Sequence, residues 1–291
     1  LNTLVDEVFN TLKDNGGRGA KYFATDICDG ETQGHDGMNY SLASRDIMAD
    51  LMEIHVKATP FDGGVFIASC DKAMPAHLMA MARLNMPSIM LPGGIMNAGP
   101  NMLTLEQIGT YNAQYERGEI TKKQYDYYKC NACPSCGACS FMGTASTMQI
   151  MSEALGMALP GTALIPVTSE ELKKAAERVS KQILKLIELD LKPSDIMTKE
   201  AFENAIMVHA AIAGSSNGIL HLPAIAHELN IEIKPELFDE IHRKIPYILN
   251  VRPSGYYPGS YFWNAGGVPG VMEEIKEFLH LDVMTVTGKT L

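Results

Sequence analysis

Hydrophobic and polar positions form short blocks along the first half of the chain, and the period of the pattern changes between blocks. Residues 2–14 carry apolar side chains at helical spacing and end at a glycine pair, which predicts an amphipathic helix. Residues 41–57 and 74–84 have the same spacing. Residues 21–27, 64–69 and 88–91 are predicted strands, and 64–69 is a continuous apolar run typical of a buried parallel strand. The alternation predicts an α/β fold with a largely parallel sheet flanked by helices.

The second half of the chain is mostly helical by its pattern. Thr168-Ser-Glu-Glu171 has the form of a capping box and predicts the start of a long helix that reaches about Leu189. Further helices are predicted at 198–212 and 216–229, and a loop rich in Gly, Pro and aromatic residues at 252–270 precedes a short helix. No repeat or linker interrupts the pattern, so we expect a single α/β domain over residues 1–291.

Composition narrows the classes of protein to consider. The chain has 291 residues, 46% of them hydrophobic, and a net charge of −10. An acidic chain lacks the basic face that a general nucleic-acid binder needs. No apolar run reaches the roughly 20 residues that span a bilayer, and no secretory signal is visible. Six cysteines in a chain of this length are better explained as reduced thiols than as disulfides, which predicts a cytoplasmic protein without nucleic-acid or membrane partners.

Five of the cysteines are candidates for metal binding. Four stand three residues apart in one predicted loop, and Cys70 lies elsewhere; the four are Cys130, Cys133, Cys136 and Cys139. Thiolates select iron–sulfur clusters, zinc or copper(I). Free cysteines also serve as small buried hydrophobic residues, and the spacing alone does not say which of the four would bind a metal.

Carboxylates follow two of the predicted strands. Cys28-Asp29 follows residues 21–27, and Cys70-Asp71-Lys72 follows residues 64–69. The carboxyl ends of parallel strands meet at one edge of a sheet, so we expect these side chains to face one crevice. Carboxylate oxygens suit a hard cation such as Mg²⁺, although an Asp after a strand is often only a turn or helix-cap residue.

Four histidines, His35, His209, His221 and His227, are possible contacts for a substrate carboxylate. Histidines in helical segments are more often satisfied core or surface residues. The sequence therefore favours only His35, which shares a loop with Asp29.

Several segments, in this order, resemble the signatures of the dihydroxy-acid and phosphogluconate dehydratase family, and they cover nearly the whole chain. The segments are Cys28–Met38 (CDGETQGHDGM) with Ser41–Arg45, Ser69–Pro75 (SCDKAMP), Gly137–Met148 (GACSFMGTASTM) with Glu153–Gly161, Ala213–Asn217, Ala265–Pro269 and Thr285–Leu291.

The resemblance implies two metal cofactors. Three cysteines of this family hold an iron–sulfur cluster, [2Fe-2S] or [4Fe-4S], and two of them correspond to Cys70 and Cys139. The family's Mg²⁺ site corresponds to Asp29, Asp71 and Lys72, with Asp71 and Lys72 also the catalytic candidates. By the resemblance Lys72 is carbamylated, since an unmodified lysine is a cation while a carbamate is an anionic oxygen ligand of the type Mg²⁺ prefers.

The same resemblance predicts that the chain is the N-terminal, cluster-bearing domain of a longer protein. The third cluster cysteine belongs to a motif that would lie just upstream of Leu1. The catalytic serine base and one more metal-binding carboxylate belong to a C-terminal domain. An alternative is that Cys133 or Cys136 replaces the missing ligand; otherwise Cys28, Cys130, Cys133 and Cys136 are expected to be structural.

The expected reaction is dehydration of a 2,3-dihydroxy acid to a 2-keto acid by a homo-oligomeric hydro-lyase. Val208–Ala211 and His221–His227 look closest to the sugar-acid dehydratases, while Arg252–Gly255 and Thr285–Leu291 look equally like the enzyme of branched-chain amino-acid biosynthesis. The sequence slightly favours a sugar acid such as an aldonate. An iron–sulfur electron carrier or sensor is a competing class, but it has no need of a hard-cation site at Asp29. A non-catalytic binding fragment is a further alternative.

Overall fold

The computed structural model describes residues 1–291, and a small parallel sheet lies at its centre. β1 (Gly64–Ala68) and β2 (Ser88–Pro92) pair in parallel along their whole length. Just after β2, Ile95 forms parallel bridges to Ala138 and to Pro166, which brings two distant loops to the same end of the sheet. The α/β prediction is confirmed, with both predicted inner strands present and a sheet of two strands.

Helices account for most of the remaining chain, as the pattern of the second half predicts. The α-helices are α1 (Asn2–Asp14), α2 (Asp29–Thr32), α3 (Ser41–Lys57), α4 (Ala73–Leu84), α5 (Gln107–Glu116), α6 (Lys122–Asn131), α7 (Thr144–Ala154), α8 (Glu170–Leu189), α9 (Pro193–Ile196), α10 (Lys199–Ala211), α11 (Asn217–His227), α12 (Pro235–His242), α13 (Gly259–Asn264) and α14 (Gly267–Glu274). Short 3₁₀ turns are η1 (Asp36–Tyr40), η2 (Pro100–Met102) and η3 (Lys276–Phe278).

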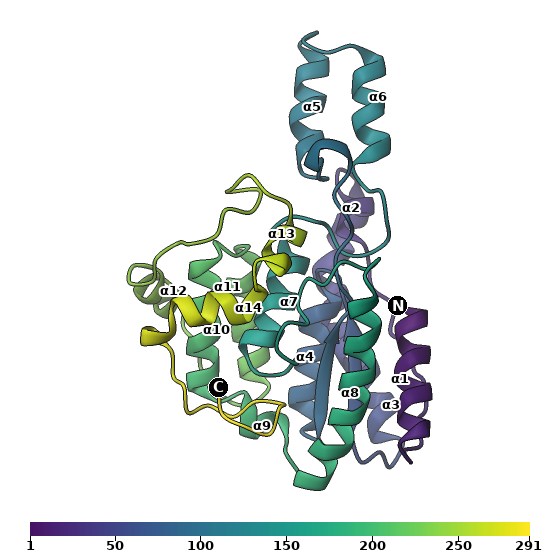
Figure 1. Cartoon of the computed structure of the whole chain (residues 1–291), viewed down its shortest axis with the longest axis vertical. Coiled ribbons are helices and arrows are strands. Elements are labelled where there is room, and N and C mark those ends of the chain that lie inside the picture. The colour runs from purple at the N-terminus through teal and green to yellow at the C-terminus, as the bar shows by residue number, and fades with distance from the viewer.

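The helices form layers around the sheet. α8 packs against both strands and carries α1 on its outer side, and α4 and α7 also pack on the sheet (Figure 1). α3 lies against α4, and α10 and α11 pack against α7. α8 is amphipathic, with an apolar stripe from Leu172 to Leu186 buried against the sheet and α1. The two helices that begin nearest the motif loops, α4 and α7, are therefore held between the sheet and further helices.

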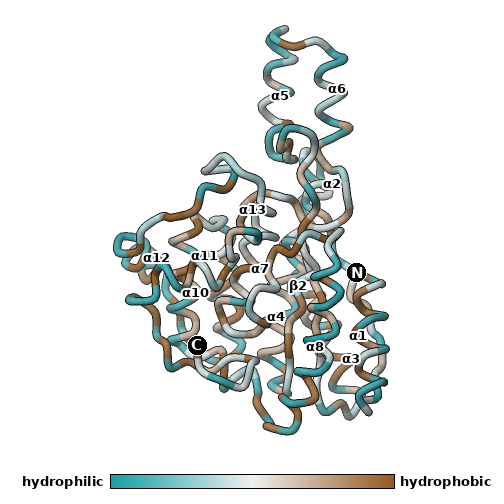
Figure 2. Tube along the Cα trace, in the orientation of Figure 1, coloured by the Kyte–Doolittle hydropathy of each residue, from teal (hydrophilic) through white to brown (hydrophobic).

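The core is centred on α4 and α7. Ten of the twelve residues of α4 are buried, and so is every residue of α7. Figure 2 shows the hydrophobic residues gathered around β2, α4 and α7, with mostly hydrophilic colours on the outer helices. α7 also buries polar side chains, including Thr144, Gln149 and Glu153, each of which needs a partner inside the protein.

α5 and α6 form an antiparallel hairpin that projects from the body of the molecule (Figure 1). Neither helix has a buried residue. The two helices are joined by aromatic pairs, with ring centroids 3.7 Å apart for Tyr111 and Tyr128 and 5.1 Å apart for Tyr115 and Tyr125. The sequence suggested that all four cysteines of the run lie in a loop. Cys130 instead lies in the last turn of α6, so the run begins in a helix.

One predicted strand is absent. Residues 21–27 have no regular structure, and Tyr22 and Phe23 are exposed. The apolar run has no neighbouring strand to pair with, because the sheet consists of β1 and β2. Asp29 consequently begins the short helix α2 instead of following a strand.

Two boundaries also differ from the prediction. The hydroxyl of Ser169, not that of Thr168, caps α8 by accepting a hydrogen bond from the amide of Glu171. The segment 252–270 contains α13 and the start of α14 instead of being a loop throughout. None of the helices combines the length and the apolar character needed to cross a bilayer.

Candidate active site

The motif loops converge on a cavity of about 270 Å³ that lies beside the N-terminus of α7. Its lining includes Asp29 from α2, Asp71 from the turn after β1, Cys139 from the cysteine loop, Thr144 from α7 and Ser215 from the turn before α11. The sequence placed the first two at one crevice by assuming that both follow strands. The structure brings them together by another route, because the ion pair between Asp29 and Lys72 joins the start of α2 to the start of α4.

Asp29 is held on both of its oxygens. Lys72, only 6% exposed, lies with Nζ 2.7 Å from Asp29 Oδ2. The hydroxyl of Ser41, at the start of α3, donates to Asp29 Oδ1. Lys72 is therefore an ammonium that neutralises the carboxylate in this structure. For Asp29 to bind a cation, this ion pair must open or Lys72 must lose its positive charge.

The Asp71 carboxyl is largely buried and close to the negative charge of Asp29. Burial raises the pKa of its carboxyl, and the negative charge of Asp29 raises it further, while Lys72 and the hydroxyl of Thr144 act in the opposite direction. Asp26, which the sequence reasoning did not consider, adds to the local negative charge, and its own pKa is also raised by burial. Two carboxylates that repel one another in a desolvated site are typical of a cation-binding position.

The two cysteines predicted to hold a cluster are half-buried; Cys139 lines this cavity, and Cys70 lies beside Asp71, which also lines it. Cys70 Sγ is 3.6 Å from Asp71 Oδ2. Burial, followed by the charge of Asp71, raises the pKa of the Cys70 thiol, and the same two effects raise the pKa of Cys139 to about 12. Without a cation these thiols stay neutral, and a bound metal would deprotonate them.

The remaining cysteines are exposed, so the interpretation of Cys28, Cys130, Cys133 and Cys136 as buried hydrophobic residues is wrong. Cys28 is close enough for its charge to raise the pKa of Cys70, Cys133 and Cys139. It therefore lies among the other thiols, although the sequence reasoning gave it no role. The sequence feature that could have indicated a role for Cys28 is its position next to Asp29.

The donor set fits the two expected cofactors only in part. Asp29, Asp71 and Cys139 line one cavity and Cys70 lies beside Asp71, so the hard oxygen donors that suit Mg²⁺ and the soft sulfur donors that suit an iron–sulfur cluster are close together. No three His, Cys, Asp or Glu side chains are arranged to hold a metal ion in this conformation. Binding would need Lys72 to release Asp29 and the thiols to turn toward one point.

α7 fixes the loops that carry these residues. Gln149 donates to the carbonyls of Ser69 and Gly94, which lie next to the two strand ends, at 3.0 Å each. The hydroxyl of Ser146 donates to the carbonyl of Cys139 at 3.1 Å. The Thr147 hydroxyl accepts from the amide of Ser215 at 2.9 Å. The sequence analysis did not predict α7 as a helix, although its polar run lies within the third signature.

The candidate histidines occupy different places. His35 is exposed and caps η1, so it belongs to the loop as predicted but makes only local contacts. His209 is buried and bridges His242 and the carbonyl of Ser215. His221 is fully buried, and burial together with the charges of Arg45 and Lys72 lowers its pKa to about 3. The sequence favoured His35, but His221 is the histidine whose pKa is affected by the charges of Lys72 and Asp29.

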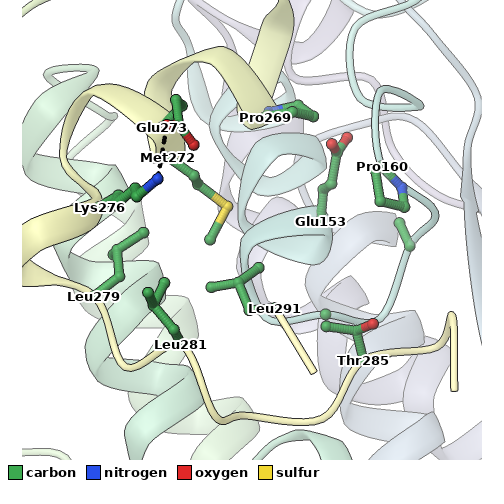
Figure 3. Close-up of a pocket in the computed structure, with 12 residues that line it drawn as sticks. Glu153, Pro160, Pro269, Met272, Glu273, Lys276, Leu279, Leu281, Thr285 and Leu291 are labelled. Carbon is green, nitrogen blue, oxygen red and sulfur yellow. Dashed lines mark hydrogen bonds and ion pairs between the residues drawn. The ribbon is translucent and has the colours of Figure 1, made fainter. Parts of the chain in front are cut away.

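A second cavity, of about 290 Å³, lies between α14 and the end of the chain and is lined in part by the later motif segments (Figure 3). Its walls are largely apolar, with Met272, Leu279 and Leu291 among them. The Glu153 carboxylate accepts hydrogen bonds from the backbone amides of residues 161–163 and so stabilises the turn that these residues form. This cavity brings together none of the candidate metal ligands.

Known proteins resemble this chain along its whole length. The family model described as dihydroxy-acid/6-phosphogluconate dehydratase N-terminal matches residues 1–291. The chain is 44% identical to the dihydroxy-acid dehydratase of Ruminiclostridium cellulolyticum and 42% identical to that of Halothermothrix orenii, in each case over 100% of the chain and 54% of the relative. It is 46% identical to the dihydroxy-acid dehydratase of Caldicellulosiruptor saccharolyticus over 91% of the chain and 49% of the relative. The chain spans about half the length of these relatives and belongs to the dihydroxy-acid/6-phosphogluconate dehydratase N-terminal family.

Proposed function

We propose that this chain is the cluster-bearing part of a hydro-lyase that converts a 2,3-dihydroxy acid into a 2-keto acid. The observation that carries the proposal is the meeting of Asp29, Asp71 and Cys139 at one cavity, with Cys70 next to Asp71. An electron carrier needs the thiols but not the carboxylates.

The substrate proposed is the branched-chain dihydroxy acid and not a sugar acid. The slight preference of the sequence analysis for an aldonate rested on two helical segments. Relatives at 40–46% identity are instead named dihydroxy-acid dehydratase, which favours the alternative reading. An aldonate remains the comparison substrate for the assay.

In the proposed reaction, Asp29 and Asp71 would hold Mg²⁺, and Cys70 and Cys139 would hold the cluster. When bound, these groups supply Lewis acidity for the departing hydroxide and for the charge that grows beside the carboxylate. Lys72 would join the Mg²⁺ ligands as a carbamate. For that step the Nζ ammonium first loses a proton, the amine lone pair then forms a bond to the carbon of CO₂, and a second proton leaves the nitrogen to the solvent.

The chain's own residues prepare this site. α7 fixes the backbone of Ser69, which precedes Cys70, and the backbone of Cys139. Ser41 orients the Asp29 carboxylate. The cavity is lined by Leu105 and Phe141 as well as by the polar groups, which limits the water around the reacting atoms.

The test is an anaerobic assay of 2-keto acid release by the full-length gene product from 2,3-dihydroxyisovalerate and from xylonate, with iron, sulfide and Mg²⁺ analysis. Asp71→Asn is expected to abolish release, while the exposed Asp62→Asn serves as its matched control. Cys139→Ala is expected to lose iron and sulfide, with the exposed Cys130→Ala as control.

The outcomes separate the candidate functions. Release from xylonate alone would overturn the substrate assignment. Bound iron and sulfide with no release from either acid would favour the electron-transfer or binding alternatives. Unchanged iron and sulfide in Cys136→Ala would reject Cys136 as a replacement cluster ligand.

A further inference from the structure

A line of buried contacts leads from the proposed metal site to a histidine. Ser41 and Arg45 are one turn apart on the same face of α3, and they are 2% and 9% exposed. Ser41 holds Asp29, which pairs with Lys72. Arg45 Nη1 lies 3.2 Å from His221 Nδ1, on α11. α11 packs against α4, at whose start Lys72 lies.

The contact with Arg45 fixes the tautomer of His221. A guanidinium has donors and no acceptor, so Nδ1 must accept the hydrogen bond with its lone pair. The imidazole is then neutral, and its single proton is on Nε2. Nε2 is buried and has no hydrogen-bond partner within the protein. A buried N–H group without a partner loses its hydration without compensation, so this donor needs an acceptor.

The surroundings specify the kind of acceptor. Lys72 and Arg45 are both almost fully buried, and Asp29 is the carboxylate that lies between them along this line of contacts. Arg45 also pairs with Asp46 at 2.9 Å, but the Asp46 side chain is 55% exposed, so along the buried line of contacts the donors of Lys72, Arg45 and His221 still outnumber the acceptors. A planar anionic group with two oxygens would supply the missing acceptor.

We propose that His221 is a positioning residue whose Nε2–H donates to an oxygen of a carboxylate-type group (O–C–O⁻) held at Lys72. Two sources provide this chemistry: a carbamate formed on Lys72 itself, or the carboxylate of the bound substrate. Both sources rest on the proposed function, which includes the carbamate of Lys72 as well as the dihydroxy-acid substrate.

The test compares His221→Leu, which removes the donor, with His221→Gln. Gln can accept from Arg45 through Oε1 and donate through its amide nitrogen. His77→Leu is the matched control, because His77 is also a buried histidine but is bonded to a helix carbonyl of α4. If His221→Leu fails to fold, His221→Asn replaces it, since its amide is too short to reach both partners.

Two binding measurements on the full-length gene product separate the sources. In the first, ¹³C-bicarbonate is added and the carbamate signal is recorded by NMR, with Lys72→Met to assign it. In the second, the Kd of 2,3-dihydroxyisovalerate is measured by calorimetry.

If the carbamate is the acceptor, the ¹³C signal falls at least about tenfold in His221→Leu and returns in His221→Gln. If the substrate is the acceptor, the Kd rises by about tenfold or more in His221→Leu, and Gln restores it. Equal values for the parent protein and His221→Leu in both measurements, or equal losses in His77→Leu, would overturn the proposal. So would a parent protein with neither signal nor binding. Neither readout depends on keto-acid release, so the proposal can fail while the proposed function stands.

Discussion

The ion pair between Lys72 and Asp29 is expected to show strong energetic coupling in the absence of metal and CO₂. Its charged atoms are 2.7 Å apart, and the two side chains are 6% and 17% exposed. At an effective dielectric constant of about 20, Coulomb attraction at this separation is about 6 kcal/mol. Desolvation offsets much of that energy, but removing one partner leaves a buried charge, which costs about 3–5 kcal/mol.

The assay is a double-mutant cycle with Lys72→Met, Asp29→Asn and the double variant. The free energy of unfolding is measured by urea titration at pH 7 with a chelator and CO₂-free buffer. We expect each single variant to lose about 3–5 kcal/mol and the double variant to lose clearly less than their sum, with a coupling of at least about 2 kcal/mol.

The exposed pair Lys122–Asp126 provides the matched cycle, with a much smaller coupling that salt removes. Additivity of Lys72→Met and Asp29→Asn within about 0.5 kcal/mol would refute the reasoning. It would mean that the ammonium of Lys72 does not hold Asp29, and that no ion pair needs to open before a cation binds.

Three further predictions concern stability. Burial lowers the pKa of His77 from 6.5 to about 4. Between these pH values the imidazole is protonated in the unfolded chain but stays neutral in the folded chain. Stability is therefore lost as the pH falls through this range, by up to about 3 kcal/mol from this residue, and urea titrations should show a flatter pH dependence for His77→Leu. Phe202→Ala should cost about 3–5 kcal/mol in the same titrations, because Phe202 is fully buried, whereas the exposed Phe23→Ala should change stability by less than about 0.5 kcal/mol. Ser169→Ala should lower stability by about 1 kcal/mol and Thr168→Ala by less. A larger loss in Thr168→Ala would mean that Thr168 caps α8, as the sequence predicted, and that Ser169 does not.

Local pattern was sufficient where a segment decides its own structure. The spacing in residues 41–57 predicted α3, and the apolar run at 88–91 predicted β2, because a buried face leaves a periodic record in the sequence. The strand predicted at 21–27 is absent, since a strand exists only with a neighbour and no sheet edge reaches this segment. α7 was not predicted from the sequence. All of its residues are buried, including the polar ones, so it lacks the alternation of polar and apolar faces that identifies an amphipathic helix.

The sequence by itself determined the family, the inner strands and the identity of the candidate ligands, because these depend on residue type and order. Only the tertiary structure decided which of them meet: Asp29 with Lys72, Cys28 with the other thiols, and His221 with Arg45. Arg45 and His221 are 176 positions apart in the chain. Hydrogen bonds and charges act over a few ångströms in space, and the packing of α3, α4 and α11 is what brings such distant positions within that range.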